Sequence, residues 1–279
     1  MGLFDGKCGL VLGVANENSI AWAVARFILE QGGVCGFTHF PDRPDDARQR
    51  NRRRVELLTS QHDEARFLVP MNVQNDDDVA AVMQRTQEEF GSIDFLVHSI
   101  AFADRADLSR PTVQTSREGF KLAMEISAYS LIAVANAAAP IMNNPSSIVT
   151  MTYFGGEKTV PGYNVMGVCK AALDSIVKYV AFDLGPQGIR VNAVSAGPVR
   201  TLAGRAAGVD EMLHLYGHMA PLGRNITHDE VGKTTAFLLS DLSDGITAEI
   251  LHIDGGYNAM GSPGRLLDRY REMQQGGEA

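Results

Sequence analysis

The chain has 279 residues, which suits one large domain or two small ones and leaves ample length for a buried core. Hydrophobic residues make up 45% and charged residues 21%, a composition that excludes a disordered, collagen-like or disulfide-scaffold protein. The formal net charge of −8 argues against a polyanionic partner, so we expect no nucleic-acid binding.

Three widely spaced cysteines, Cys8, Cys35 and Cys169, form no C-x-x-C and have no paired histidine spacing, so the sequence predicts no metal site and a reducing, cytoplasmic location. No apolar run approaches the roughly 18 residues that a membrane helix needs, because Asn136 interrupts the richest stretch, Leu131–Met142. We therefore expect no membrane insertion.

Short β-branched runs alternate with longer amphipathic stretches along the chain, which is typical of repeated βαβ units. Strands are expected at Gly9–Gly13, Val34–Thr38, Ala65–Pro70, Ile93–His98, Ser147–Met151, Arg190–Val194 and Glu249–Ile253. Helices are expected at Ile20–Gln31, Asp45–Ser60, Asp76–Phe90, Glu118–Ala138, Tyr163–Leu184 and His228–Leu239. The pattern predicts an α/β fold: a single Rossmann-type doubly wound domain with a seven-stranded parallel sheet and helices on both faces.

Two segments interrupt this alternation. Residues Phe102–Arg117 are polar and irregular, and Gly197–Asn225 is a long insertion with glycines at 204, 208 and 217. Loops of this length usually serve function, so we interpret residues 197–225 as a substrate-covering flap. No linker divides the chain; residues 1–261 are predicted to form one domain, and residues 262–279 a tail to which we assign no function.

A loop from Gly13 to Ala21 joins the first predicted strand to the first helix. Such a loop brings backbone N–H groups and a helix N-terminus toward a pyrophosphate. It is not a G-x-G-x-x-G motif, and an ordinary turn with Ser19 as helix N-cap explains it equally well.

Tyr163 and Lys170 are seven residues apart, about two helical turns, so in a helix they share one face with Met166. The alternative is a packed tyrosine and a lysine that snorkels to the surface. The apolar run after Lys170 predicts a mostly buried helix, in which a lysine needs an anionic or hydroxyl partner.

These features together resemble the short-chain dehydrogenase/reductase family and, within it, the enoyl-acyl-carrier-protein reductases of bacterial type II fatty acid synthesis. The similarity spans about residues 3 to 258. It is carried by the Gly13-x5-Ser19-Ile20-Ala21 loop, His98-Ser99-Ile100-Ala101, Tyr153, the Tyr163-x6-Lys170 pair, Ser195–Ala203 and His252–Gly256.

The position of the tyrosine separates this subfamily from its relatives. Most members of the wider family place a tyrosine four residues before the lysine, where this chain has Met166, and their helix asparagine is replaced around Ile126–Ser127. In enoyl reduction hydride goes to Cβ while negative charge develops on the thioester oxygen. A donor displaced by one turn suits that geometry, because electrostatic help counts where charge develops.

The resemblance implies a catalytic set of Tyr163, Lys170 and Tyr153. Tyr163 would donate to the thioester carbonyl and stabilise the enolate, Lys170 would hold the nicotinamide ribose, and Tyr153 would shape the pocket or assist protonation. A tyrosine and an ordered water remain alternative sources of the Cα proton. The expected substrate-lining residues are Phe102, Tyr153, Tyr163, Met166, Ala203, Val209 and Met212.

The implied cofactor is NADH, with NADPH less favoured, since the subgroup that looks most similar uses NADH. The segment Phe40-Pro41-Asp42-Arg43 after the second strand carries neither a clear carboxylate nor a clear arginine signal. The expected cofactor-binding residues are Gly13, Ala15, Ser19, Ile20, Phe40, Asn72, Val73, Ser99, Ile100, Ala101, Met151, Lys170, Ala196, Pro198, Val199 and Thr201.

Acyl carrier protein bearing an enoyl chain is the implied partner, and a homotetramer the implied assembly. Arg200 and Arg205 beside the flap suit an acidic carrier, whereas the arginines between Arg48 and Arg54 are interpreted as a solvated helix face. Two other functions stay open: a carbonyl or alcohol oxidoreductase of the same fold, which Met166 disfavours, and a non-catalytic nucleotide-sensing protein, which Tyr163 and Lys170 disfavour.

Overall fold

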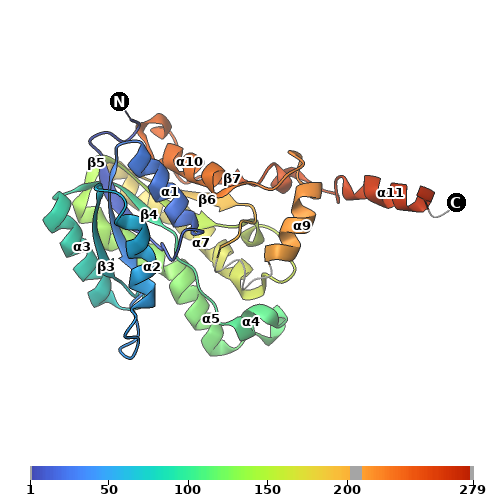
Figure 1. Ribbon diagram of the computed structural model, residues 1–279, viewed down its shortest axis with the longest axis horizontal. Helices are drawn as coiled ribbons and strands as arrows, with labels where there is room; N and C mark the ends of the chain where they lie inside the picture. The colour runs from blue at the N-terminus through green and yellow to red at the C-terminus, as the bar shows by residue number, and fades with distance from the viewer. Residues whose placement is uncertain (1, 202–208, 277–279) are drawn as a thin grey trace.

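A seven-stranded parallel sheet forms the centre of the computed structural model, which describes residues 2–201 and 209–276 (Figure 1). The strand order is β3-β2-β1-β4-β5-β6-β7. The strands are β1 (Cys8–Leu12), β2 (Val34–His39), β3 (Ala65–Pro70), β4 (Ile93–His98), β5 (Met142–Thr152), β6 (Ile189–Ala196) and β7 (Ile250–Ile253). The order reverses between β1 and β4, the switch point where doubly wound sheets bind ligands. The predicted fold class is confirmed.

Helices cover both faces of the sheet, and the central strands divide their side chains between two apolar clusters. On β1, Val11 packs with α1 (Ile20–Glu30) and α10 (His228–Leu239). Its neighbours Leu10 and Leu12 pack with α3 (Asp76–Phe90), α6 (Ser130–Ala138) and α7 (Asn164–Leu184). Because side chains alternate along a strand, a continuous apolar run supplies both cores.

The second helix begins later than the sequence predicted: α2 spans Arg50–Thr59 instead of starting at Asp45. The Asp42 carboxylate accepts hydrogen bonds from the backbone N–H groups of Asn51 (2.7 Å) and Arg52 (3.1 Å), at the start of the helix. Asp42 therefore caps α2 from a distance, which satisfies helix N–H groups and fixes the start.

The predicted helix Glu118–Ala138 is interrupted. It consists of α5 (Arg117–Met124), a π-helical turn (Glu125–Tyr129) and α6. The Ser130 hydroxyl donates to the Ile126 carbonyl at 2.7 Å, inside that turn.

Among the described residues, Arg117–Ile141 is long and apolar enough to cross a membrane, by length and composition alone. The sequence had predicted no such segment, but the mean hydropathy of this stretch stays high despite Asn136. Its buried Leu131 and Val134 pack in the core, as in a core helix of a globular domain.

The two irregular segments contain further helices. The first holds α4 (Arg105–Ser109) and a 3₁₀ turn (Thr112–Gln114). The predicted flap includes α9 (Val209–Met219), while residues 202–208, with the expected substrate residue Ala203, lie outside the described chain. The final helix, α11 (Leu266–Gly276), projects away from the sheet (Figure 1).

Candidate active site

A cleft of about 530 Å³ opens at the carboxyl ends of β1, β4, β5 and β6, beside the start of α7. This is the position expected for a ligand site in a doubly wound sheet. Residues from all of these elements and from α9 line it: Gly13, Ala15, Ser19, Ile20, Ser99, Ile100, Ala101, Phe102, Ala103, Leu108, Met151, Thr152, Tyr153, Tyr163, Met166, Lys170, Ala196, Gly197, Pro198, Val199, Thr201 and Met212. Most of the residues that the sequence assigned to the site therefore meet here.

Tyr163 and Lys170 both face the cleft from α7. Tyr163 is the N-cap residue of the helix, and Lys170 lies seven residues further on, so the helical period places them on one side, as the spacing predicted. Met166 lies between them and is buried; its sulfur is 3.8 Å from the Ser127 hydroxyl of the π-helical turn. The position that holds a tyrosine in most of the wider family is thus occupied by the buried side chain of Met166.

Lys170 is deeply buried, and its partner is a backbone group. The Nζ atom donates to the Met151 carbonyl at 2.7 Å, whereas the sequence predicted an anionic or hydroxyl partner. Burial lowers the pKa of Lys170 to about 8, although nearby Asp174 opposes the shift. A hydrogen bond that fixes one direction of the ammonium leaves its other donors for a group in the cleft.

The two tyrosines that line the cleft touch each other. The rings of Tyr153 and Tyr163 meet edge to face, with centroids 4.7 Å apart. Burial is the main cause that raises the pKa of both phenols above the ordinary value. Both groups are therefore protonated at neutral pH and available as hydrogen-bond donors.

The glycine loop leads into the N-terminus of α1. Ser19 occupies the N-cap position, but its hydroxyl accepts from the backbone N–H groups of Ala15 and Asn16, both at 3.0 Å, instead of capping α1. Within the described residues no hydrogen bond uses the N–H of Ile20 or Ala21, in the first turn of α1. Unpaired N–H groups at a helix N-terminus fit a pyrophosphate. Ser19 therefore lies at the N-cap position as expected, but its side chain does not cap the helix.

Gly13 brings the loop close to β4. A Cβ atom at Gly13 would lie 2.0 Å from the Ser99 carbonyl oxygen, and its φ of +96° is one that side chains rarely adopt. Only glycine lets the two strand ends approach so closely on the floor of the cleft. The residues present therefore fit a dinucleotide along this side of the cleft.

Three expected cofactor residues lie outside the cleft lining, at the ends of β2 and β3. Phe40 is exposed, whereas Val73 is buried in the apolar core. The Asn72 side-chain oxygen accepts from the backbone N–H of Gln74 at 3.2 Å, so it is partly used in a local turn. Asp42, the nearest carboxylate after β2, caps α2 with both of its oxygens.

The other side of the cleft is apolar. Phe102, Met166 and Met212 line it as expected, and it also includes Ala103 and Leu108, which sequence reasoning missed. Val209 lies at the start of α9. Ala103 and Leu108 come from the irregular segment around α4, whose polar composition gave no sign of a cleft wall.

Sequence reasoning also missed a buried hydrogen-bond chain behind the cleft. His98 Nε2 lies 2.9 Å from the Ser130 hydroxyl, and His98 Nδ1 lies 2.8 Å from the Thr150 hydroxyl. Because Ser130 donates to Ile126, it accepts from His98, which places the imidazole proton on Nε2. Burial lowers the pKa of His98 to about 3, so the ring is neutral.

Among residues 2–201 and 209–276, no group of three or more His, Cys, Asp or Glu side chains is placed to hold a metal ion. The polar chemistry of the described cleft rests on hydroxyl, ammonium and backbone groups.

The comparisons with known proteins agree with this geometry. The family model described as enoyl-(acyl carrier protein) reductase matches residues 13–258. The chain belongs to this family. It is 46% identical to the enoyl-acyl-carrier-protein reductase (NADH) FabI of Nostoc sp., over 92% of this chain and 98% of the relative.

Solved structures in this family superpose closely. The Bacillus cereus enoyl-acyl carrier protein reductase with NADP⁺ and indole naphthyridinone matches with a TM-score of 0.88 and 45% identity, over 94% of this chain and all of that one. The Anaplasma phagocytophilum reductase in complex with NAD matches with a TM-score of 0.87 and 43% identity, over 94% and 97%.

Proposed function

We propose that the protein reduces the trans-2 double bond of enoyl thioesters carried on acyl carrier protein, with NADH, in type II fatty acid biosynthesis. One observation carries the proposal: Tyr163 and Lys170 face one cleft from α7, with Met166 packed at the position four residues before the lysine. That arrangement disfavours a carbonyl reductase, and the intact pair disfavours a non-catalytic sensor.

The dihydronicotinamide supplies the hydride that reaches Cβ of the acyl group. The Tyr163 hydroxyl donates to the thioester oxygen, where negative charge develops as Cβ accepts hydride, and so stabilises the enolate. Its raised pKa keeps the proton in place for that hydrogen bond. Tyr153, in edge contact with Tyr163, restricts the ring and closes the polar end of the cleft.

Lys170 binds and orients. With Nζ fixed by the Met151 carbonyl, its remaining donors would hold the ribose hydroxyls of the nicotinamide nucleotide. The N–H groups of Ile20 and Ala21 would hold the pyrophosphate, and Gly13, Ala101 and Val199 line the same cleft. The described residues after β2 do not distinguish NADH from NADPH. NADH is favoured because the relatives' names specify it.

The apolar wall receives the acyl chain. Phe102, Met166, Met212 and Leu108 offer the apolar surface that a fatty acyl group buries. Acyl carrier protein delivers the thioester from the open side, near Arg200 and the segment proposed as the flap. We place the reaction in the cytoplasm, where the three free cysteines Cys8, Cys35 and Cys169 stay reduced.

A homotetramer is proposed for the assembly. Val168, Tyr179 and Phe182 lie on one face of α7 by helical period, and Tyr179 and Phe182 are 71% and 81% exposed. Exposed aromatic side chains gathered on one helix mark an interaction surface. Residues 1–261 would form the catalytic unit, with 262–279 outside it. Phe182→Glu should reduce the mass measured by light scattering, whereas Tyr270→Glu on α11 should not; an unchanged mass contradicts this assembly face.

The reaction is tested by mixing purified protein with NADH and crotonyl thioester and following the loss of NADH absorbance. Loss with the enoyl substrate and none with an acetoacetyl thioester supports the proposal. Turnover of the keto substrate alone would instead support a carbonyl reductase, and NADH binding without turnover of either would support a sensor.

A further inference from the structure

Asn164 is the residue directly after Tyr163 and the first residue of α7. Its backbone is left-handed, with a φ of +38°. Asparagine tolerates this conformation better than most residues, yet it costs energy and needs a compensating contact. The side chain supplies one: Nδ2 donates to the Leu108 carbonyl at 2.6 Å and to the Arg110 carbonyl at 2.8 Å.

These two bonds join α7 to the end of α4, which is a helix of a single turn. It has five residues and no side-chain cap, and a single isolated turn is unstable in water. Both amide hydrogens of Asn164 are used, one on each carbonyl. Asn164 therefore satisfies carbonyl groups that the short helix leaves unpaired.

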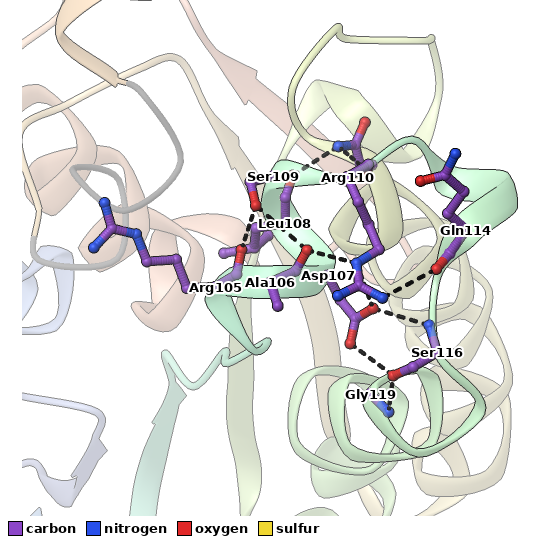
Figure 2. Close-up of polar contacts among 10 residues, drawn as sticks. Arg105, Ala106, Asp107, Leu108, Ser109, Arg110, Gln114, Ser116 and Gly119 are labelled. Carbon is purple, nitrogen blue, oxygen red and sulfur yellow. Dashed lines mark hydrogen bonds and ion pairs between the residues drawn. The ribbon is translucent and has the colours of Figure 1, made fainter.

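The other side of α4 is held by its own local network (Figure 2). The Asp107 carboxylate accepts from the Ser116 N–H and hydroxyl, both at 2.9 Å, and Arg110 Nε donates to the Ala106 carbonyl at 2.9 Å. A Cβ atom at Gly119 would lie 1.7 Å from Asp107, so α5 packs directly on this carboxylate. The network ties α4 to α5, whereas Asn164 ties it to the catalytic helix.

Leu108 connects this clamp to the cleft. Its carbonyl accepts from Asn164, and its side chain lines the apolar wall and packs in a small cluster with Val165 and Met166. We propose that Asn164 is a positioning residue that fixes the Leu108 wall relative to Tyr163, so that a long acyl chain is held without displacing the tyrosine. This inference rests on the proposed function and deepens it, since it concerns which enoyl chains the enzyme reduces efficiently.

Substrate length separates this role from a general structural one. Crotonyl thioester has a single methyl carbon beyond Cβ, so it can accept the tyrosine hydrogen bond without contacting Leu108 on the apolar wall. A dodecenoyl chain continues along the apolar surface. Loss of the clamp should therefore affect the long substrate selectively, with its effect on kcat/KM and not on NADH binding.

Three variants test the inference. Asn164→Gly keeps the left-handed backbone without strain but removes both donors, and Asn164→Asp keeps the shape but places a carboxylate against two carbonyls. Ser109→Ala is the matched control, because among the described residues its hydroxyl bonds only to the Arg105 and Ala106 carbonyls within α4. Each is assayed with crotonyl and dodecenoyl thioesters, and the cofactor-free protein is examined by hydrogen exchange.

In both Asn164 variants we expect kcat/KM for dodecenoyl thioester to fall about 5- to 30-fold, the factor equivalent to one or two kcal/mol. The kcat/KM for crotonyl thioester should stay within about twofold of the wild-type value. The backbone amides of residues 104–116 should exchange hydrogen faster, by a factor similar to the fall in kcat/KM for dodecenoyl thioester. Ser109→Ala should change neither ratio. Equal loss on both substrates, no loss on either, or wild-type behaviour of Asn164→Gly overturns the inference. If the wild type reduces no enoyl thioester, the proposed function fails instead, and the exchange rates still report whether the clamp exists.

Discussion

The Lys170 ammonium donates to the Met151 carbonyl at 2.7 Å and thereby joins α7 to the end of β5 on the floor of the cleft. Met151 belongs to β5, which pairs with β4 on one side and β6 on the other, so the lysine is held by an interior strand of the sheet. A cofactor ribose would meet a donor whose position is already fixed, which reduces the ordering cost of binding.

Burial of Lys170 predicts a specific dependence of stability on pH. Its pKa is about 8 in the folded protein and about 10.5 when unfolded. Between these values the unfolded chain binds more protons, so the free energy of unfolding should rise with pH, by about 3 kcal/mol from this group. The protein with Lys170→Met should lack this rise. Denaturant titrations of both cofactor-free proteins from pH 7 to 10.5 measure the difference, in which the tyrosine contributions cancel; parallel curves would contradict the assigned shift.

Tyr163→Phe removes the proposed enolate donor and leaves the ring in place. Loss of one such donor typically costs about 2.7–4 kcal/mol, so kcat/KM for crotonyl thioester should fall about 10²- to 10³-fold. The dissociation constant of NADH, measured by fluorescence, should stay within about twofold. Tyr270→Phe, an exposed phenol on α11, is the matched control. Full activity of Tyr163→Phe would show that the oxyanion role is misassigned.

Local patterns predicted the sheet and the side of α7 that faces the cleft well, because both depend on periodicity. The seven runs of apolar residues became seven parallel strands, and the seven-residue spacing of Tyr163 and Lys170 placed both on the cleft. Strand ends were less accurate: β5 begins at Met142, not Ser147. Met142 pairs with Ile93 of β4, and the register then shifts before Ser147 pairs with Phe95. Pro145, inside this stretch, is typical of a loop.

Contacts between residues far apart in the chain could not be predicted from the sequence. Asp42 had no clear role from the sequence alone, and only the folded chain shows that its carboxylate caps α2. His98 meets Thr150 and Ser130 across 52 and 32 residues, and no spacing rule joins such positions. Asn164 reaches Leu108 across 56 residues. The sequence showed an asparagine beside the tyrosine, but nothing local indicated which carbonyl groups its amide binds.

Gly13→Ala should abolish NADH binding. The added Cβ would lie 2.0 Å from the Ser99 carbonyl oxygen, on backbone that cannot move without displacing β4. We expect a loss of about 2 kcal/mol or more in the free energy of unfolding, from strain and clash together. Gly91→Ala is the control, because that glycine also has a positive φ, of +73°, but nothing lies within 4 Å. Calorimetric titration with NADH and thermal unfolding measure both effects; equal behaviour of the two variants would show that the close approach does not matter.

The buried neutral His98 predicts acid sensitivity. Its pKa is about 3 in the folded protein and about 6.5 when unfolded, so below pH 6.5 the unfolded chain binds the extra proton. Stability is therefore lost as pH falls, by about 2 kcal/mol between pH 6.5 and 5 from this group alone. His98→Gln keeps a polar side chain but does not titrate, so its unfolding free energy should fall less over the same interval, whatever its starting value. Denaturant titrations at pH 7, 6 and 5 compare the two slopes. Identical slopes would mean that His98 binds its proton in the folded state over the same pH range as in the unfolded chain. Both ring nitrogens would then donate, and the Thr150 hydroxyl would accept from Nδ1 instead of donating to it.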